Sequence, residues 1–304
     1  MDQSPSPVPS AASLSLSSVE PTLPVSAPHP PSAYSAPTSA LLKGEERVSR
    51  IDPVKDGDTI VVWFSCGAAS AVAAWLTLRC YGHRCNVRIV NNYIKQEDAD
   101  NRRFLADVER WLGMTFERAA SSKYPAGDCV EVWEDRQYIS GTKGAPCTTW
   151  LKKKARQEFE DRNPHEWIVM GFTADEEARH SNFVKTERPN LLPILIEAGL
   201  SKQECFQLIA NRGIELPLMY RLGYPNANCI GCVKATSPTY WNHVRRVHPE
   251  VFAERAEQSK RIGCKLVRHK GRRVFLDELP ADAKGHPMKS LKMPECTIFC
   301  EERL

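Results

Sequence analysis

From residue 59 to residue 213, short apolar runs rich in β-branched residues alternate with longer segments of helical periodicity. This alternation is the feature that most constrains the fold. The apolar runs are TIVVWFS (59–65), NVRIVNN (86–92), MTFERAA (114–120), EWIVMGF (166–172) and LLPILI (191–196), and the helical segments are 68–82, 98–113, 148–162 and 201–213. Strands separated by helices of this length predict an α/β fold, a parallel sheet with helices on both faces.

Amino-acid composition and predicted secondary structure divide the chain into three parts. Residues 1–45 are rich in Pro, Ser and Ala and contain no Lys or Arg before Lys43. Such a segment buries too little apolar surface to offset its ordering entropy, so we expect a disordered tail. Residues 46–222 form the sheet domain. Residues 223–304 form a small cysteine-bearing appendage with a basic helix and a hairpin-like element, RHKGRRVFLDEL.

Composition narrows the class of protein. The net charge of +4 lies far from that of a dedicated nucleic-acid binder. The first forty residues lack the basic and apolar regions of a signal peptide, and no run is long enough to span a membrane. We therefore expect a cytoplasmic protein without a membrane partner, in which the 11 cysteines are reduced. Cys80, Cys85 and Cys129 lie among apolar neighbours and are interpreted as small buried hydrophobic residues.

The first predicted strand ends in the small residues SCGAAS (Ser65–Ser70), and a helix follows at once. Small residues let backbone N–H groups approach an anion, and the start of a helix adds its positive dipole end. The hydroxyls of Ser65 and Ser70 are further donors. The loop therefore predicts a phosphate site, although a tight strand–helix turn needs small residues for packing alone.

NCIGC (228–232) predicts a metal centre, because two thiolates at C-x₂-C spacing chelate one centre. Cys147 starts a predicted helix, where the helix dipole favours the thiolate, and is the third candidate ligand. The fourth ligand is left open among Cys264, Cys296 and Cys300. A site with three thiolates leaves one iron exposed to carry sulfur, whereas a site with four is closed.

The order of these motifs resembles the phosphoadenosine phosphosulfate (PAPS) reductase family, including its phage-type members, within the adenine nucleotide α-hydrolase-like enzymes. SCGAAS is similar to that family's Ser-Gly-Gly-x-Asp-Ser loop, and residues 91–113 are similar to its second strand and the following helix. Residues 144–159 are similar to the family's cysteine and basic helix, and MGFTADEEAR (170–179) is similar to its substrate loop. The resemblance implies that ATP or PAPS binds at the loop. The residues implicated are Ser65, Cys66, Gly67, Ala68, Ala69, Ser70, Glu97, Gly171 and Arg179.

The chain departs from this pattern at the loop. Ala69 replaces the aspartate expected near the phosphates or their magnesium ion, which weakens the case for ATP cleavage. Glu97, Asp98 or Asp100 is the alternative source of a carboxylate, and one of Lys152, Lys153 and Lys154 is a candidate for contact with a phosphate or sulfate.

One cysteine followed much later by C-x₂-C also resembles the iron–sulfur sites of adenylyl-sulfate reductases and of sulfur-transferring α-hydrolases. This implies a [4Fe–4S] cluster on Cys147, Cys229 and Cys232. The fourth ligand stays open, including the absence of any protein ligand, and we expect Cys296 or Cys300 to serve the metal site. ECTIFC (295–300) is similar to the Glu-Cys-Gly-x-His tail of PAPS reductases and makes Cys296 the candidate catalytic residue. Here the tail lacks the histidine, and its glutamates disfavour a reactive thiolate.

We therefore expect an enzyme that transfers sulfur to an adenylylated acceptor or reduces activated sulfate. The basic stretches WNHVRRVH and RHKGRR make a nucleic acid a candidate acceptor. One alternative is a non-catalytic nucleotide- or nucleic-acid-binding module stapled by zinc on Cys229, Cys232, Cys296 and Cys300. Another is a nucleotide sensor without catalysis. The sequence indicates no oligomeric state.

Overall fold

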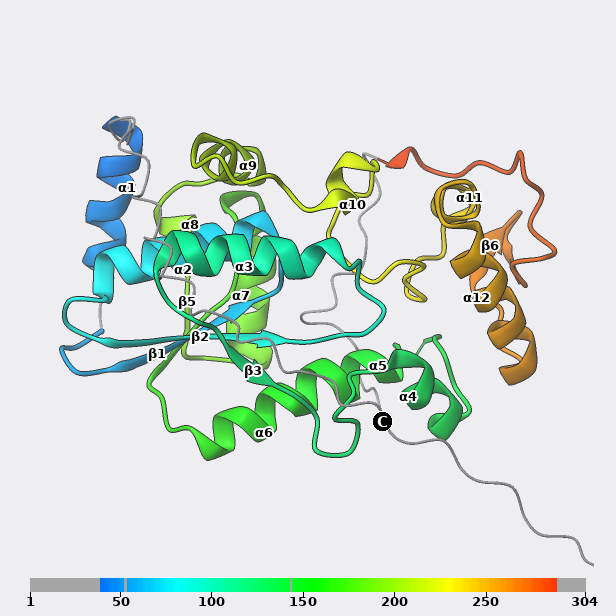
Figure 1. Cartoon of the computed structure of the whole chain (residues 1–304), viewed down its shortest axis with the longest axis horizontal. Helices are drawn as coiled ribbons and strands as arrows, with labels where there is room; N and C mark the ends of the chain where they lie inside the picture. Colours follow the sequence, from blue (N-terminus) through cyan, green and yellow to red (C-terminus); the bar gives the residue numbers. More distant parts are fainter. Residues whose placement is uncertain (1–38, 52–53, 143, 289–304) are drawn as a thin grey trace, which may run out of the picture. The chain divides into compact units, whose positions relative to one another are not determined.

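The computed structural model describes residues 39–51, 54–142 and 144–288. Their centre is a sheet of β1 (Thr59–Phe64), β2 (Asn86–Asn92), β3 (Glu117–Ala119), β4 (Trp167–Val169) and β5 (Leu191–Leu192). The strand order is β3-β2-β1-β4-β5, and all four pairings are parallel. Helices cover both faces of the sheet, so the predicted α/β fold is confirmed (Figure 1).

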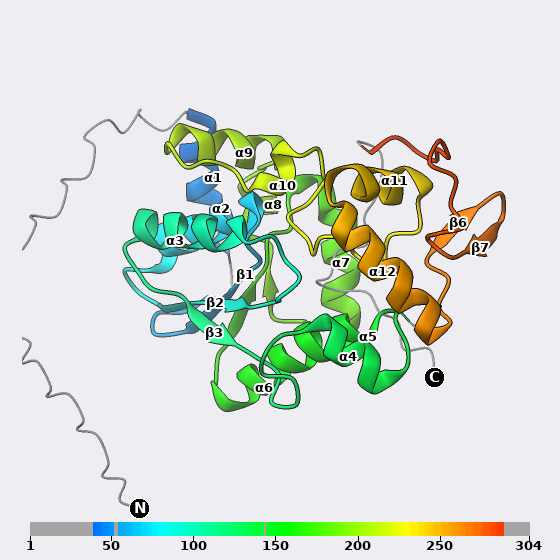
Figure 2. The same cartoon turned by 45° about the vertical axis from the view of Figure 1, so that its right-hand side comes forward.

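The alternation of side chains along β1 separates two cores. Ile60, Val62 and Phe64 face a core shared with α1 (Ser39–Ser49), α2 (Ala68–Tyr81), α3 (Asp100–Leu112), α8 (Ile194–Glu197) and α9 (Lys202–Asn211). Val61 and Trp63 face the opposite core, which includes Phe159 of α6 (Ala155–Arg162) and Phe183 of α7 (Glu177–Thr186). The two views place α6 across the sheet from α2 and α3 (Figures 1 and 2).

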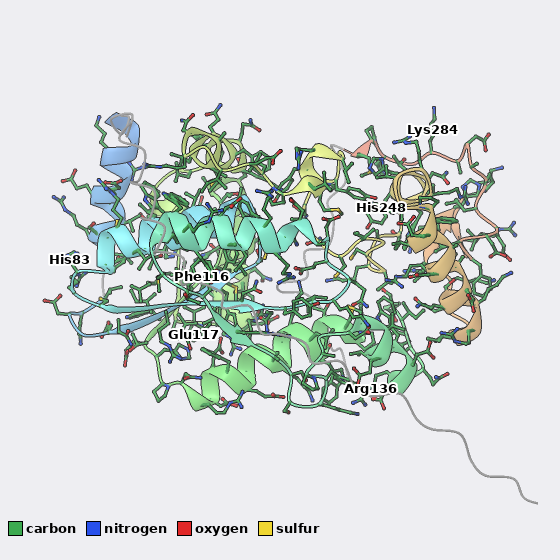
Figure 3. The ribbon with its side chains drawn as sticks, in the orientation of Figure 1. His83, Phe116, Glu117, Arg136, His248 and Lys284 are labelled. Atoms are coloured by element: carbon green, nitrogen blue, oxygen red, sulfur yellow. The ribbon has the colours of Figure 1, made fainter. Side chains whose placement is uncertain are left out.

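A third core joins the C-terminal region to a distant part of the chain. It contains side chains from residues 124–151 as well as from residues 219–279. The helices that enclose it are α4 (Cys129–Arg136), α5 (Pro146–Thr148), α10 (Leu218–Arg221), α11 (Pro238–Val247) and α12 (Pro249–Ile262). Arg261 of α12 pairs with Glu134 of α4. His248 lies between α11 and α12 (Figure 3). Its ring packs on that of Tyr224.

The predicted hairpin is present at the end of this region. Strands β6 (Val267–His269) and β7 (Arg272–Val274) pair antiparallel. Lys270 and Gly271 between them have φ of 47° and 78°, the left-handed conformation of a two-residue hairpin turn.

Three elements differ from their predicted form. The helix expected from Thr148 begins at Pro146 and contains a π-helical turn, Thr149–Lys154, before α6. The strand expected over 191–196 is limited to β5 because Pro193 lacks the N–H that a continuing ladder requires. Residues 39–45, expected in the tail, belong to α1, where the Tyr81 hydroxyl donates to the Val48 carbonyl.

Among the described residues, no helix is both long and apolar enough to cross a bilayer.

Candidate functional site

The strand order reverses at β1. The chain runs from β1 to β2 and β3 on one side, and β4 and β5 are added on the other. The loops after β1 and β4 therefore diverge at the carboxyl edge of the sheet, where open parallel sheets bind their ligands. The loop Ser65–Ser70 follows β1, and the segment Met170–Thr173 follows β4.

Hydrogen bonds within the loop Ser65–Ser70 hold its shape. The Ser65 N–H donates to the Ser70 hydroxyl at 3.1 Å, and this hydroxyl donates to the Gly67 carbonyl at 2.9 Å. Gly67 stands at the N-cap of α2, and no described side chain caps the helix there. The first N–H groups of α2 therefore retain the capacity to bind an anion.

Cys66, within the loop, points its side chain into the protein core. Its φ of 55° lies in the left-handed region, where glycine is favoured, and its side chain is fully buried. The Asn91 amide donates to its sulfur at 3.5 Å. Burial, and then the charge of Glu97, raise the pKa of the Cys66 thiol. Cys66 and the equally buried Ala68 can therefore meet a ligand through their backbone alone.

A cavity of about 110 Å³ opens at this point. Its walls come from the ends of β1 and β4, the start of α2, and the segments around residues 97, 152 and 226. The lining residues are Trp63, Phe64, Ser65, Gly67, Ala69, Ser70, Asn92, Glu97, Lys152, Arg156, Met170, Gly171, Phe172, Thr173, Glu176, Lys202, Tyr220, Asn226, Ala227 and Asn228. The cavity thus combines aromatic rings, amides, three cationic groups and two carboxylates, a composition suited to a nucleotide.

Gly171 lies directly on the loop. A Cβ atom on Gly171 would stand 2.7 Å from the backbone nitrogen of Ser70 and 3.0 Å from the carbonyl carbon of Ala69. Glycine is required here because two backbones meet, and the contact braces the start of α2.

Glu97 and Lys152 form a buried ion pair in the cavity wall, with Oε1 and Nζ 3.4 Å apart. The side chains are 4% and 14% exposed, respectively. Burial raises the pKa of the Glu97 carboxyl, and Lys152 opposes that shift. Burial also lowers the pKa of the neighbouring Arg156 to about 10, so its guanidinium stays charged at neutral pH.

The π-helical turn separates the three predicted lysines. Lys152 lines the cavity, whereas Lys153 pairs with Glu187 at 3.1 Å and Lys154 lies 3.8 Å from the centre of the Trp150 ring. Arg179 is absent from the cavity wall in the described part of the chain. It forms an ion pair with Glu176 at 2.5 Å and so neutralises a carboxylate that lines the cavity.

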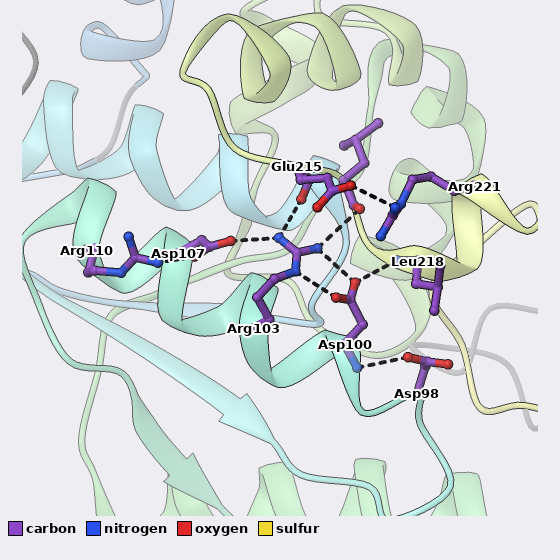
Figure 4. Close-up of polar contacts among 9 residues, drawn as sticks. Asp98, Asp100, Arg103, Asp107, Arg110, Glu215, Leu218 and Arg221 are labelled. Atoms are coloured by element: carbon purple, nitrogen blue, oxygen red, sulfur yellow. Dashed lines mark hydrogen bonds and ion pairs between the residues drawn. The ribbon is translucent and has the colours of Figure 1, made fainter.

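Asp98 and Asp100, the other predicted carboxylates, serve a structural network. Asp100 accepts hydrogen bonds from the Arg103 guanidinium and from the Leu218 N–H at 2.7 Å (Figure 4). Arg103 lowers the pKa of the Asp100 carboxyl. Asp98 accepts from the Asp100 N–H. This network fixes residues 215–221 to α3 and thereby brings Tyr220 to the cavity.

Beside the cavity, four cysteines line one small apolar hollow: Cys129, Cys147, Cys229 and Cys232. The thiols of Cys147 and Cys229 lie within hydrogen-bonding reach of Cys129, and these contacts, with burial, raise the pKa of the Cys129 thiol. Gly231 allows the turn between Cys229 and Cys232 with a φ of 63°. As the side chains stand, no three His, Cys, Asp or Glu groups among the described residues are arranged to hold a single metal ion.

Three segments join the hollow to the cavity. Gln96 lines the hollow and Glu97 the cavity, Cys147 and Lys152 stand on one continuous helical stretch, and Cys229 follows Asn228. The predicted nucleotide loop and the three predicted thiol ligands, far apart in the sequence, are therefore brought to neighbouring sites.

Other predicted residues lie elsewhere. The Cys264 thiol donates to the Ser140 carbonyl at 3.0 Å, and Cys264 does not line the hollow. Cys296 and Cys300 are outside the described residues. In WNHVRRVH, Trp241 is fully buried and Arg245 donates to the Leu279 carbonyl, so these two residues belong to the core of the fold. Contact of this stretch with a nucleic acid stays a prediction.

No family model matches the chain, and no curated protein matches it. Among solved structures, the chain is similar to the U34-tRNA thiolase NcsA from Methanococcus maripaludis with its [4Fe-4S] cluster. The two chains share 12% sequence identity over 73% of this chain and 74% of that chain, with a TM-score of 0.40. A likeness this distant carries no weight for the chemistry of the site.

Several site residues escaped the sequence analysis. Arg156 lies in the predicted basic helix but was not singled out with its three lysines, and Lys202 and Tyr220 reach the cavity from helices without a predicted site motif. Cys129 joins the thiols instead of acting as a plain hydrophobic residue, although its burial was predicted. A signal was available, because Asp128 before Cys129 is a good helix N-cap and places this thiol at a helix start, like Cys147.

Proposed function

We propose that this chain is an enzyme of sulfur chemistry that binds an adenine nucleotide in the cavity and an iron–sulfur cluster at the hollow. The observation that carries the proposal is the adjacency of the two sites through three shared segments. The adenine nucleotide α-hydrolase-like fold with residues 46–222 as its nucleotide domain, and membership of the PAPS reductase family, remain part of this proposal.

The cavity fits a phosphorylated nucleotide. Backbone N–H groups at the start of α2 and the charges of Lys152, Arg156 and Lys202 would bind the phosphates, while Trp63 and Phe172 offer apolar surface to the base. Both carboxylates of the wall are already paired, Glu97 with Lys152 and Glu176 with Arg179. These pairs favour direct neutralisation of phosphates by the protein over a dedicated magnesium site, and ATP and PAPS both remain candidates.

The donor set of the hollow, four cysteines in an apolar wall, fits an iron–sulfur cluster and also a zinc ion. We propose the cluster because the order of the cysteine motifs resembles that of the iron–sulfur enzymes. Cys147, Cys229 and Cys232 would hold the cluster, which would supply redox chemistry when bound. The reaction is either transfer of sulfur to an adenylylated acceptor or reduction of activated sulfate. Nucleic acid belongs among the acceptors to be tested because Arg268, Lys270 and Arg272 are exposed on the hairpin.

Anaerobic purification with iron, sulfide and zinc analysis tests the cofactor. We expect iron and sulfide in nearly equal amounts, and a colourless protein with stoichiometric zinc would contradict the proposal. Incubation with ATP and an acceptor, assayed for pyrophosphate, and with PAPS and a thiol reductant, assayed for sulfite, distinguishes the two reactions.

Calorimetric titration with PAPS and ATP tests the cavity. We expect Lys152→Met to weaken binding by about tenfold or more, the scale of a charge-assisted hydrogen bond. Lys153→Met is the matched control, since Lys153 pairs with Glu187 outside the cavity. Gly67→Val should also block binding, because a Cβ on Gly67 already approaches the Tyr220 hydroxyl at 3.3 Å. Equal affinities in the wild type, Lys152→Met and Gly67→Val would place the nucleotide elsewhere.

A further inference from the structure

Cys129 is held firmly at the edge of the thiol hollow. It is the first residue of α4, and the Asp128 carboxylate before it accepts from the Val130 N–H at 2.8 Å. The Cys129 N–H donates to Oε1 of Gln96 at 2.8 Å, and the Gln96 amide donates to Asp128 at 2.7 Å. These bonds tie the start of α4 to the segment that leads into the nucleotide cavity.

The Cys129 side chain points at the other cysteines. Its residue is 3% exposed, and its thiol contacts those of Cys147 and Cys229. Cys232 lines the same hollow. A structural buried cysteine packs its sulfur among carbon atoms, whereas this sulfur is gathered with three others.

The positive charges that line the hollow also favour thiolates within it. Arg255 lines the hollow, is 3% exposed, and its Nε has no hydrogen-bond partner in the described structure. Its guanidinium rests on the Trp133 ring at 4.8 Å and donates to Gln258. None of the ion pairs among residues 39–288, where described, involves Arg255. Lys234, 9% exposed, also lines the hollow. The buried charge of Arg255 favours buried negative charge beside it, which metal-bound thiolates would supply.

We infer that Cys129 is the fourth protein ligand of the metal centre, together with Cys147, Cys229 and Cys232. The inference rests on the proposed function and deepens it. The set is complete without Cys264, Cys296 or Cys300. A cluster held by four thiolates has no open iron, so the sulfur that reacts would be carried elsewhere, and the centre would act on the cavity through charge and electron transfer.

The test uses Ser variants of the full chain, reconstituted anaerobically with iron and sulfide. We expect Cys129→Ser, like Cys147→Ser, to lose most of its iron and visible absorption or to retain a cluster with an altered electron paramagnetic resonance spectrum. Cys264→Ser and Cys300→Ser should match the wild type. Full iron with an unchanged spectrum in Cys129→Ser would overturn the inference, and so would loss of iron in Cys300→Ser.

A second measurement on the wild type guards against misfolding of the variant. Alkylation followed by mass spectrometry, with and without prior removal of the cluster, should show all four cysteines becoming reactive only after removal. An unchanged rate at Cys129 would overturn the inference. If the wild type carries no iron, the proposed cofactor fails, and Co²⁺ titration of the same variants still tests Cys129. Loss of the cobalt–thiolate absorption in Cys129→Ser would then support its role, and undiminished absorption would refute it.

Discussion

The contact between Gly171 and the loop Ser65–Ser70 allows a quantitative test of how the cavity is built. Gly171→Ala would place a methyl group 2.7 Å from the Ser70 nitrogen and 3.0 Å from the Ser70 Cα. These are backbone atoms at the start of a packed helix, and they cannot move aside like the end of a flexible side chain. Gly171 does not have a left-handed φ, so the cost is steric alone.

Such overpacking costs about 1–3 kcal/mol. If the start of α2 is displaced and the whole cost falls on nucleotide binding, the affinity falls roughly 5- to 150-fold, since about 1.4 kcal/mol is a factor of ten. Any part that falls on the fold instead lowers the melting temperature. Calorimetric titration with PAPS and thermal denaturation of the same sample measure both parts.

Gly67→Ala is the matched control. Its Cβ would meet the Tyr220 hydroxyl at 3.3 Å, the mobile end of a side chain, so we expect a smaller loss of affinity than in Gly171→Ala. Unchanged affinity and melting temperature in Gly171→Ala would refute the view that Gly171 braces the loop. A larger loss in Gly67→Ala would assign the sensitive contact to Tyr220.

Two further predictions concern stability. Arg255→Met should leave the metal-free protein equally stable or stabilise it by about 1–4 kcal/mol, because it removes a buried cation without an ion-pair partner among the described residues. The same substitution should destabilise the metal-loaded protein. Urea unfolding measures the stability of both forms, and a change of the same sign in both would be evidence against thiolates beside Arg255. Burial lowers the pKa of His180, so the folded state binds this proton less tightly than the unfolded state does. Stability should therefore fall as the pH drops through the ordinary histidine value of about 6.5, and less so in His180→Gln; identical profiles between pH 7.5 and 5.5 would contradict this.

The periodicity of the sequence was sufficient to predict the sheet and most of its helices. Strand β1 could be identified because five consecutive apolar residues must be buried on both faces, and α9 because Ser201 is a good helix N-cap and Gly213 ends the helical pattern. The strand–loop–helix at Ser65–Ser70 was likewise a local pattern. The spacing of Cys229 and Cys232 predicted that their thiols lie close together, because only two residues separate them in a tight turn.

The cavity and the full thiol set depended on contacts between segments far apart in the chain. Arg156 and Lys202 reach the cavity because of the direction in which α6 and α9 cross the sheet, and a helix sequence does not reveal which polar residue will face a neighbour. Cys129 looked like a core residue because its neighbours are apolar, and that was true of its burial. Its role as a candidate ligand arose when the third core placed α4 against the turn at Cys229, a pairing of residues 100 positions apart that local periodicity does not encode.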